Sequence, residues 1–476
     1  MERPSKKSEL AQFFNQLAPE RDRWLNKNRF FYQDDLRYFH YLVPKGKRVA
    51  ELGCGTGDLL SQLEPSYGVG LDISEEMIKL AREKHDHLTF LVGDVEEGAT
   101  LDQLEGPFDY IILPDLIGYL EDVEETFLAL HRLCTPETRI IITHYNQLWG
   151  PILNLGAQLG MKMPSRIQNW LTGQQICSFL KIGDFDLIQR ERRQLIPVSL
   201  MGLGALVNQY IAPFPVIRRL CLRNFFVARP LPDPTPRELS TTVVIPCRNE
   251  RGNVEAAIKR IPPFCQDMEI LYVEGNSQDG TFEEIQRVID AYPNLDIKGF
   301  QQTGKGKGDA VRLGFDKARG ELLMILDADL TMPPEDLPKF YRAISQRKGE
   351  FINGSRLVYP MEDEAMRTLN LWANSTFSYL FSWLLNQPLT DTLCGTKVLL
   401  KKDYEQIAKN RSYFGTFDPF GDFDLLFGAA KANLKIREIP IRYRARSYGE
   451  TQISRFRHGV LLLKMVLFAF RKLKSF

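Results

Sequence analysis

Alternating apolar and polar stretches divide this chain into two successive series of expected strands and helices. In the first series, KRVAELGCGTGDLLSQL predicts a buried strand, a glycine-rich turn and the start of a helix. Further strands are expected in YGVGLDIS, LTFLVGDVEE, FDYIILPDLIGYLED and TRIIITHYN, and LTGQQICSFLKIGDFDLIQRERR predicts a helix and a sixth strand. This alternation is typical of an α/β domain.

The second series begins with STTVVIPCRNE, a β-branched strand that ends at a proline. A helix from about Asn253 to Ile261, a strand in MEILYVEGNSQDGT, another helix and the strand LDIKGFQQ follow, and then GKGKGDAVRLGFDKARG and ELLMILDADL. Strands that alternate with helices imply a mostly parallel sheet, which binds ligands at the carboxyl ends of its strands.

The stretch FVARPLPDPTPREL separates the two series and contains Pro230, Pro232, Pro234 and Pro236. Proline fixes φ and lacks an N–H, so this run predicts a semi-rigid, extended spacer and no helix or central strand. A chain of 476 residues also exceeds the size at which one hydrophobic core keeps growing. We therefore expect an α/β protein of two domains, residues 1–229 and 238–476, with residues 230–237 as the linker.

The first series carries a candidate nucleotide site. Glycines after its first strand let the backbone approach a ligand closely, and acids end the next two strands. The residues are Glu51, Gly53, Gly55, Gly57, Asp72 and Asp94. The position of Asp72, about twenty residues after the glycines, suits an acid that accepts ribose hydroxyls. The GxGxG spacing, Glu51 and Asp94 differ from a dinucleotide-binding fingerprint.

This set resembles the class I S-adenosylmethionine-dependent methyltransferases, over roughly Gln12 to Arg229. The resemblance implies a Rossmann-like fold in which Glu51 and the glycines line the cofactor, Asp72 holds the ribose and Asp94 holds the adenine. The alternative is a Rossmann-like module that binds a nucleotide without chemistry or has lost binding.

The methyl acceptor is expected against the loop Pro114–Tyr119 and the insertions Tyr145–Arg166 and Pro197–Arg219. His144 and Asp115 are the candidate bases, although a single histidine is more often a structural residue, which is the interpretation we favour for His144. The second insertion is unusually apolar for a loop, so it either covers a hydrophobic substrate or packs on the fold.

In the second series, MILDADL places Asp327 and Asp329 directly after a very apolar strand. Two carboxylates at a strand end direct hard oxygen ligands toward one place, which suits Mg2+ or Mn2+ together with ligand phosphates. The sequence therefore predicts a divalent metal site formed by these two residues.

Together, VIPCRNE, GKGDAVRLGF, DAD, NGSRL and DTLCGTKVLLK resemble the family-2, GT-A fold glycosyltransferases, particularly those acting on polyprenyl phosphates, over Ser240 to about Gly459. The resemblance implies a set of residues that bind the nucleotide-sugar donor: Pro246, Asn249, Glu250, Glu274, Asp279, Lys307 and Asp327. It implies Arg356, Asp391 and Lys397 on the acceptor side. One departure is Glu274–Gly275, where two adjacent aspartates are usual, and it leaves the nucleobase open.

The family inverts at the anomeric carbon by direct displacement, and the acceptor decides whether a base is needed. A hydroxyl acceptor requires a carboxylate base, for which Asp422 and Asp424 are the candidates. A phosphate acceptor is already anionic, so Arg356, Arg444 or Arg446 would orient its oxygens instead. The other interpretation of Asp422 and Asp424 is a helix N-terminus, where exposed amides favour acids.

The composition of the chain indicates which classes of binding partner and which cellular location to expect. The 61 Lys and Arg nearly cancel the 60 Asp and Glu, which argues against a general nucleic-acid binder. Scattered cysteines, a polar N-terminus and the absence of a membrane-length apolar run favour a cytoplasmic protein. The basic, apolar end SRFRHGVLLLKMVLFAFRKLKSF and the stripe in RTLNLWANSTFSYLFSWLLNQ favour peripheral contact with the inner face of a membrane. The stripe is also typical of a helix that packs in the core.

These expectations combine into a bifunctional enzyme. One half would move a sugar, with metal, from a nucleotide sugar to a polyprenyl phosphate, and the other would methylate a related glycan, lipid or metabolite. The alternatives are a glycosyltransferase with a polysaccharide or soluble hydroxyl acceptor, and a chain in which one half is a non-catalytic binding module.

Overall fold

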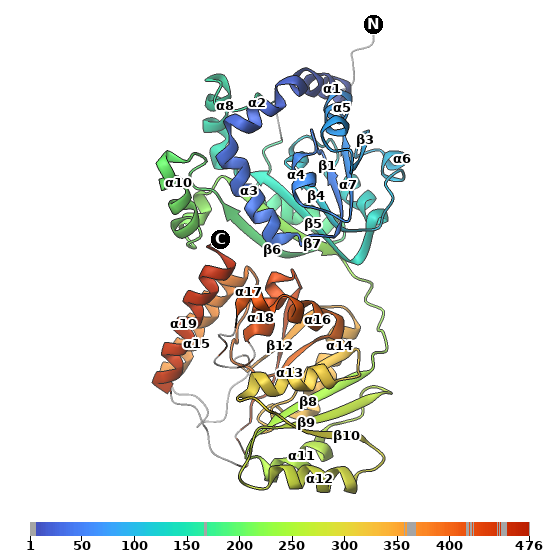
Figure 1. Ribbon diagram of the computed structural model, residues 1–476, viewed down its shortest axis with the longest axis vertical. Helices are drawn as coiled ribbons and strands as arrows, with labels where there is room; N and C mark the ends of the chain where they lie inside the picture. Colours follow the sequence, from blue (N-terminus) through green and yellow to red (C-terminus); the bar gives the residue numbers. More distant parts are fainter. Residues whose placement is uncertain are drawn as a thin grey trace. The chain divides into compact units, whose positions relative to one another are not determined.

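The computed structural model describes residues 6–165, 169–356, 358, 368–415, 418, 421, 423–444, 446, 448 and 455–475, with the backbone alone for residues 368–373 and 455–458. The chain forms two compact units (Figure 1). The first comprises residues 1–231 with 475–476, and the second comprises residues 232–474.

The first unit is built on a seven-stranded sheet with the order β3-β2-β1-β4-β5-β7-β6. The strands are β1 (Arg48–Leu52), β2 (Tyr67–Asp72), β3 (Thr89–Val92), β4 (Phe108–Pro114), β5 (Cys134–Tyr145), β6 (Phe185–Arg193) and β7 (Arg223–Pro230). The strands β1 to β5 are parallel, and β7 runs antiparallel between β5 and β6. The six strands expected from the apolar runs are confirmed.

Helices cover this sheet, and two buried apolar clusters pack on it. The helices are α1 (Lys6–Leu17), α2 (Arg21–Lys27), α3 (Arg29–Leu42), α4 (Asp58–Gln62), α5 (Glu75–Lys84), α6 (Gly98–Leu101), α7 (Val123–Leu130), α8 (Gly150–Gln158), α9 (Gly173–Ile182) and α10 (Leu203–Leu206). Local sequence sets several starts: Ser74 accepts a hydrogen bond from the amide of Met77 at α5, and Thr172 with Gln175 forms a capping box at α9.

The strand β7 corrects the expected linker. Pro230 was expected to open an extended spacer, but it is the last residue of β7 and lies opposite Phe185 of β6. Proline is tolerated there because the ladder between β5 and β7 ends at Ala228, so no bond to β5 is lost.

The second unit contains a seven-stranded mixed sheet with the order β10-β9-β8-β11-β13-β12-β14. The strands are β8 (Thr241–Cys247), β9 (Met268–Glu274), β10 (Asp296–Gln301), β11 (Leu322–Ile325), β12 (Phe351–Ser355), β13 (Lys397–Leu400) and β14 (Ile436–Pro440). The strands β10, β9, β8 and β11 are parallel, as expected, and β13 runs antiparallel to both β11 and β12.

The helices of this unit are α11 (Arg251–Arg260), α12 (Thr281–Ala291), α13 (Lys307–Lys317), α14 (Leu337–Ser345), α15 (Thr368–Leu385), α16 (Lys401–Lys409), α17 (Arg411–Phe414), α18 (Phe423–Lys431) and α19 (Arg455–Leu473). A single buried cluster from Leu239 to Ile441 packs on β8, β9 and β11. This core holds the carboxyl ends of the parallel strands in register.

The helices α15 and α19 pack against each other, with the rings of Trp383 and Phe470 5.8 Å apart. Phe381, Leu384 and Leu385 are buried, so this part of the α15 stripe is a core face and does not lie at a lipid surface. The side chains of Leu369 and Trp372, which belong to the same expected stripe, lie outside the described residues. Among the helices that the structure describes, none is long and apolar enough to cross a bilayer.

Candidate functional sites

A cavity of about 530 Å3 lies at the carboxyl ends of the parallel strands of the first unit. Five of the six residues predicted to bind the cofactor of this unit line the cavity: Glu51, Gly53, Gly55, Asp72 and Asp94. The sixth, Gly57, does not. The backbone at Gly53 and Gly55 has positive φ, which glycine adopts without strain. The turn therefore brings main-chain atoms to the cavity wall.

The acids on the wall are held by backbone amides. Asp72 accepts from the amides of Gly55 (2.8 Å) and Ser74 (2.9 Å), and Glu51 accepts from the amide of Leu60 (3.0 Å). Burial raises the pKa of Asp72, and it raises the pKa of Glu51 to about 8. Each acid therefore ionises at a cost in free energy, which a cationic ligand offsets.

Asp94 has a partner that the sequence did not suggest. Lys7 of α1 lies 2.8 Å from Asp94 Oδ2 and also contacts Glu96. The two residues are far apart in the sequence, so no local sequence pattern predicts this contact. Lys7 also lines the cavity.

Gly57 is the exception. It does not line the cavity, and a Cβ at this position would lie 2.5 Å from Cζ of Phe90. The glycine is needed for packing and for its positive φ at the start of α4, which corrects the expected cofactor contact.

A buried cation joins two acids at the opposite wall. Arg223 is 2% exposed, and its guanidinium lies 2.5 Å from Asp115 Oδ1 and 2.9 Å from Asp35 Oδ2. Although burial lowers the pKa of Arg223, the two carboxylates raise it above its usual value, and burial raises the pKa of Asp35 to about 7. Asp115, a predicted candidate base, is therefore engaged by a charge that sequence reasoning missed.

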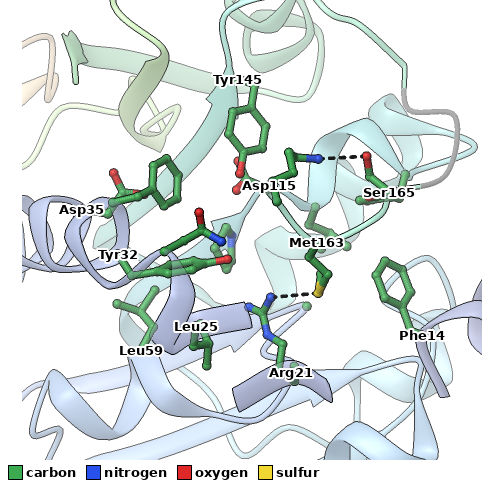
Figure 2. A pocket seen from close by; sticks show the side chains of 18 of the residues that line it. Phe14, Arg21, Leu25, Tyr32, Asp35, Leu59, Asp115, Tyr145, Met163 and Ser165 are labelled. Carbon is green, nitrogen blue, oxygen red and sulfur yellow. Dashed lines mark hydrogen bonds between the residues drawn. The ribbon is translucent and has the colours of Figure 1, made fainter. Parts of the chain in front are cut away.

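The remaining polar groups of the cavity come from the first three helices and from β5. Figure 2 shows Arg21, Tyr32, Asp115 and Tyr145 around one space, with Arg21 bonded to the sulfur of Met163 (3.5 Å). Sequence reasoning did not identify Arg21, Tyr32 or Asp35 as site residues. A signal was present for Asp35: two adjacent acids interrupt the aromatic helix RFFYQDDLRYFHYL.

His144 does not line the cavity. It is 1% exposed, and neither ring nitrogen has a hydrogen-bond partner among the described residues. Burial lowers its pKa, so it remains neutral. The geometry favours the structural interpretation of this histidine over the catalytic one.

In the second unit, ion pairs meet where β11 ends. Asp327 Oδ1 lies 2.6 Å from Nζ of Lys307, and Asp329 Oδ2 lies 2.7 Å from the guanidinium of Arg446. Burial opposes ionisation of Asp327, but the charge of Lys307 outweighs it and lowers the pKa. Arg446 also lies 3.5 Å from Glu250, whose pKa burial raises. The two predicted metal ligands therefore form one cluster with Lys307 and Glu250, which were predicted to bind the donor, and with Arg446, which was predicted to orient a phosphate acceptor.

Two loops beside this cluster are fixed by their own hydrogen bonds. Asn249 Oδ1 accepts from the amide of Gln278 (2.9 Å), and Glu274 accepts from the amide of Ser277. Asp279 accepts from the hydroxyl of Thr281 (2.5 Å) at the start of α12, and Pro246 pairs with Val273 within the sheet. Among these predicted donor residues, Glu274 and Asp279 have their carboxylates engaged by their own turns.

Arg356 and Asp391 form a bidentate pair at 2.7 and 2.8 Å. Asp391 is 2% exposed and also accepts from the amide of Leu393 (3.0 Å), and despite burial the Arg356 charge lowers its pKa. The guanidinium also lies over the ring of Tyr443. Asp391 therefore orients Arg356 and is not available as a base. Lys397 is 1% exposed and donates to the carbonyl of Cys394, and its charge contributes to the lowered pKa of Asp327.

Asp424 lies in the first turn of α18 and is 8% exposed. One oxygen accepts from Arg312 (3.0 Å) and Arg411 (3.2 Å). Both arginines therefore engage this carboxylate in ion pairs. The geometry thus favours the helix-terminus interpretation of Asp424 over the role of a base. Asp422, the other candidate, lies outside the described residues.

Two family models match this chain, and each match falls within one of the two units. A family model described as a methyltransferase domain matches residues 44–190, and one described as glycosyl transferase family 2 matches residues 242–407. Among solved structures, a SAM-dependent methyltransferase from Thermotoga maritima is 17% identical with a TM-score of 0.37, over 46% of this chain and 98% of its own.

Curated relatives match the second unit. Dolichol-phosphate mannosyltransferase of Pyrococcus furiosus is 37% identical over 122 residues, 25% of this chain and 34% of its own length. Dolichyl-phosphate beta-glucosyltransferase of Trichomonas vaginalis is 25% identical over 255 residues, 50% of this chain and 71% of its own. The chain thus spans about a third of the length of the Pyrococcus relative. The first unit is thus similar to a methyltransferase domain and the second to glycosyl transferase family 2, and each match lies on a seven-stranded α/β sheet.

Proposed function

We propose that the chain is a bifunctional enzyme. Its second unit transfers a sugar from a nucleotide sugar to a polyprenyl-phosphate-type carrier, and its first unit uses S-adenosylmethionine to methylate a related glycan, lipid or metabolite. We also propose two domains joined by the proline-rich stretch, the first extended from the expected residue 229 to residue 231 so that it includes the end of β7, and the second from residue 238. The acceptor class rests on the names of the relatives, which include dolichyl and undecaprenyl phosphate transferases.

The observation that carries the glycosyltransferase half is the cluster at the end of β11. Lys307 and Arg446 are held within 2.7 Å of carboxylates, and the side chains of Asp327 and Asp329 remain 28% and 17% exposed. A diphosphate that enters the cluster would meet two fixed cations. Both would neutralise charge on the departing nucleotide, which lowers the barrier to sugar transfer.

Asp327 and Asp329 fit a divalent cation. Both offer oxygen ligands next to one another, and no three His, Cys, Asp or Glu side chains gather as a ready-made metal site in the described part of the chain. A cation bound by two carboxylates completes its coordination with phosphate oxygens and water, as Mg2+ does. When bound, it would supply further positive charge to the leaving diphosphate.

A phosphate acceptor agrees better with this site than a hydroxyl does. Arg356 is oriented by Asp391 and would bind anionic oxygens, whereas Asp424 is engaged by Arg312 and Arg411. A phosphate needs no base to attack. The hydroxyl-acceptor alternative therefore depends on Asp422.

Peripheral membrane contact is proposed for α19. Leu462 and Met465 face the protein, whereas Val460, Leu463 and Leu467 are exposed, with Lys464 between them. Exposed apolar residues with basic neighbours suit an anionic interface, where a lipid-linked acceptor lies.

Transfer of labelled sugar tests the proposal. Purified chain is incubated with Mg2+ or Mn2+, a short polyprenyl phosphate in detergent and a panel of radiolabelled nucleotide sugars, and label in the organic phase is counted. We expect transfer from one donor, and a loss of about a hundredfold or more in Asp329→Ala. Asp336→Ala, an acid at the start of α14, is the matched control and keeps activity.

Transfer without added metal would contradict the metal site. If no donor is used although the nucleotide binds, the lipid-phosphate acceptor is wrong. Loss of activity in Asp422→Asn, with activity toward a hydroxyl acceptor in the wild type, would favour the alternative.

A further inference from the structure

Two segments of the first unit expose an unusual amount of apolar surface. They are residues 148–161, around α8, and residues 198–220, around α10. Met201 and Val216 are the most exposed, at 105% and 77% of a free side chain. Among the described residues of this unit, the large apolar side chains exposed outside these segments are Val92, Leu128, Ile182 and Leu231. Exposed apolar surface concentrated in this way marks an interaction site.

The sheet brings both segments to the same edge. The first follows the carboxyl end of β5 and the second follows the carboxyl end of β6, and the two strands are parallel because β7 runs antiparallel to both. Figure 1 shows α8 and α10 on one side of the unit. This is the edge of the sheet at which the cavity opens.

The cavity continues into this surface. Its inner wall is polar, with Arg21, Asp35, Asp115 and Arg223. Its outer wall is apolar and comes from the exposed segments: Ile152, Leu155, Leu159, Met161 and Val198. A molecule that fills it has a polar end beside the predicted cofactor residues and an apolar end that leaves through the exposed surface.

The charge of the segments specifies their partner. No Asp or Glu occurs in residues 146–166 or 195–222, whereas Lys162, Arg166, Arg218 and Arg219 do. Lys162 lines the cavity, Arg218 lies 3.7 Å from Glu191 of β6, and Arg219 is exposed. Apolar side chains with basic residues and no acid are complementary to an anionic lipid surface. A protein partner is not favoured, because no acid is present to pair with its basic groups.

We propose that the methyltransferase unit takes a membrane lipid as its methyl acceptor, with residues 148–161 and 198–220 lying on the bilayer around the cavity mouth. This inference rests on the proposed function, since it requires S-adenosylmethionine in the cavity. A nucleophilic atom of the lipid head group forms a bond to the methyl carbon while the methyl–sulfur bond breaks. The electron pair stays on sulfur as S-adenosylhomocysteine, and any proton on the nucleophile passes to water.

The test is partition of the full chain onto vesicles. Vesicles of phosphatidylcholine with and without phosphatidylglycerol are sedimented with the wild type, a Met201→Glu/Val216→Glu variant and Ile182→Glu. Neither Met201 nor Val216 lines the cavity, so the double variant keeps its cofactor contacts. Ile182 is 50% exposed but precedes β6, at the other edge of the sheet, so Ile182→Glu is the matched control.

We expect the double variant to bind phosphatidylglycerol vesicles about tenfold more weakly than the wild type and Ile182→Glu to bind as the wild type does. Under the proposed function α19 also binds lipid, which could mask the effect of the double variant. The comparison is therefore repeated with Leu463→Glu and Leu467→Glu added to the wild type and to each variant, so that α19 contributes less to vesicle binding. A second variant, Leu155→Glu, should weaken vesicle binding in the same direction.

Calorimetric titration with S-adenosylmethionine distinguishes a failure of the lipid surface from a failure of the proposed methyltransferase activity. If the cofactor binds but the double variant and Ile182→Glu partition equally, the lipid surface is wrong and the proposed function stands. If no heat is released, the proposed methyltransferase activity itself fails. A change in sedimentation velocity of the double variant, without a change in vesicle binding, would identify the surface as a contact between copies of the chain and would overturn the proposal.

Discussion

The acids of the two candidate sites are held in different ways. In the first unit, Glu51 and Asp72 accept hydrogen bonds from backbone amides. In the second unit, Asp327 and Asp329 each face the side chain of a lysine or an arginine. Acids held by amides favour a cationic ligand such as a sulfonium, whereas paired cations can turn to a diphosphate. The difference teaches that two α/β sheets with acids at the same strand ends can be prepared for ligands of opposite charge.

Arg223 is the strongest test of this comparison, because it is a cation that pairs with acids in the same cavity where amides hold Glu51 and Asp72, as Lys7 does with Asp94. In Arg223→Met, Asp35 and Asp115 lose their buried partner. We expect the free energy of unfolding of the first unit to fall by about 3–5 kcal/mol. Urea unfolding measures it. Arg219→Met, at an exposed position in the same unit, is the control and should change little. Equal losses in the two variants would contradict a buried cluster.

Asp72 tests the preference for a cation. In Asp72→Asn, the charge is removed and a side-chain amide can face the amide of Gly55. Affinity for S-adenosylmethionine should fall about tenfold to a hundredfold, with a smaller loss for the uncharged sulfur of S-adenosylhomocysteine. Calorimetric titration measures both. Asp86→Asn, whose side chain is 99% exposed, should bind as the wild type does. The comparison is wrong if both ligands lose affinity equally.

Glu51 tests the comparison through a dependence of stability on pH. Burial raises its pKa from 4.5 to about 8, so the folded state keeps a proton that the unfolded state releases. The free energy of unfolding therefore falls as pH rises through this window, by at most ~1.4 kcal/mol per pH unit. Glu51→Gln removes this contribution, so the wild type should lose stability relative to the variant between about pH 6 and about pH 8. Parallel slopes in urea unfolding would contradict a buried, protonated Glu51.

The elements that sequence predicted best are those whose pattern is local. The buried strands β1, β2 and β11, which end at Leu52, Asp72 and Ile325, are continuous apolar runs that stop at a turn, and each lies where it was expected. The strand β7 was missed because RNFFVARP contains buried arginines and ends in proline. Its arginines are satisfied by acids far away in the sequence, such as Asp35 and Asp186.

The site residues also divide into those that a local sequence pattern predicts and those that depend on distant parts of the chain. The glycines and acids of the turns could be predicted, because a single segment provides them. Lys7, Arg21 and Arg223 could not, because each reaches the cavity from a helix or strand outside the motifs. The roles of Asp391 and Asp424 could not be assigned either, since their arginine partners become visible only in three dimensions.

The antiparallel strand β7 has a consequence for synthesis of the chain. It is the last strand of the first unit, yet it lies inside the sheet between β5 and β6. While the ribosome is still translating the preceding residues, β6 has no hydrogen-bonded neighbour in this sheet and β5 presents an open edge. The nascent first unit can therefore close its sheet only after residue 230 has left the exit tunnel, when translation of the second unit has already begun.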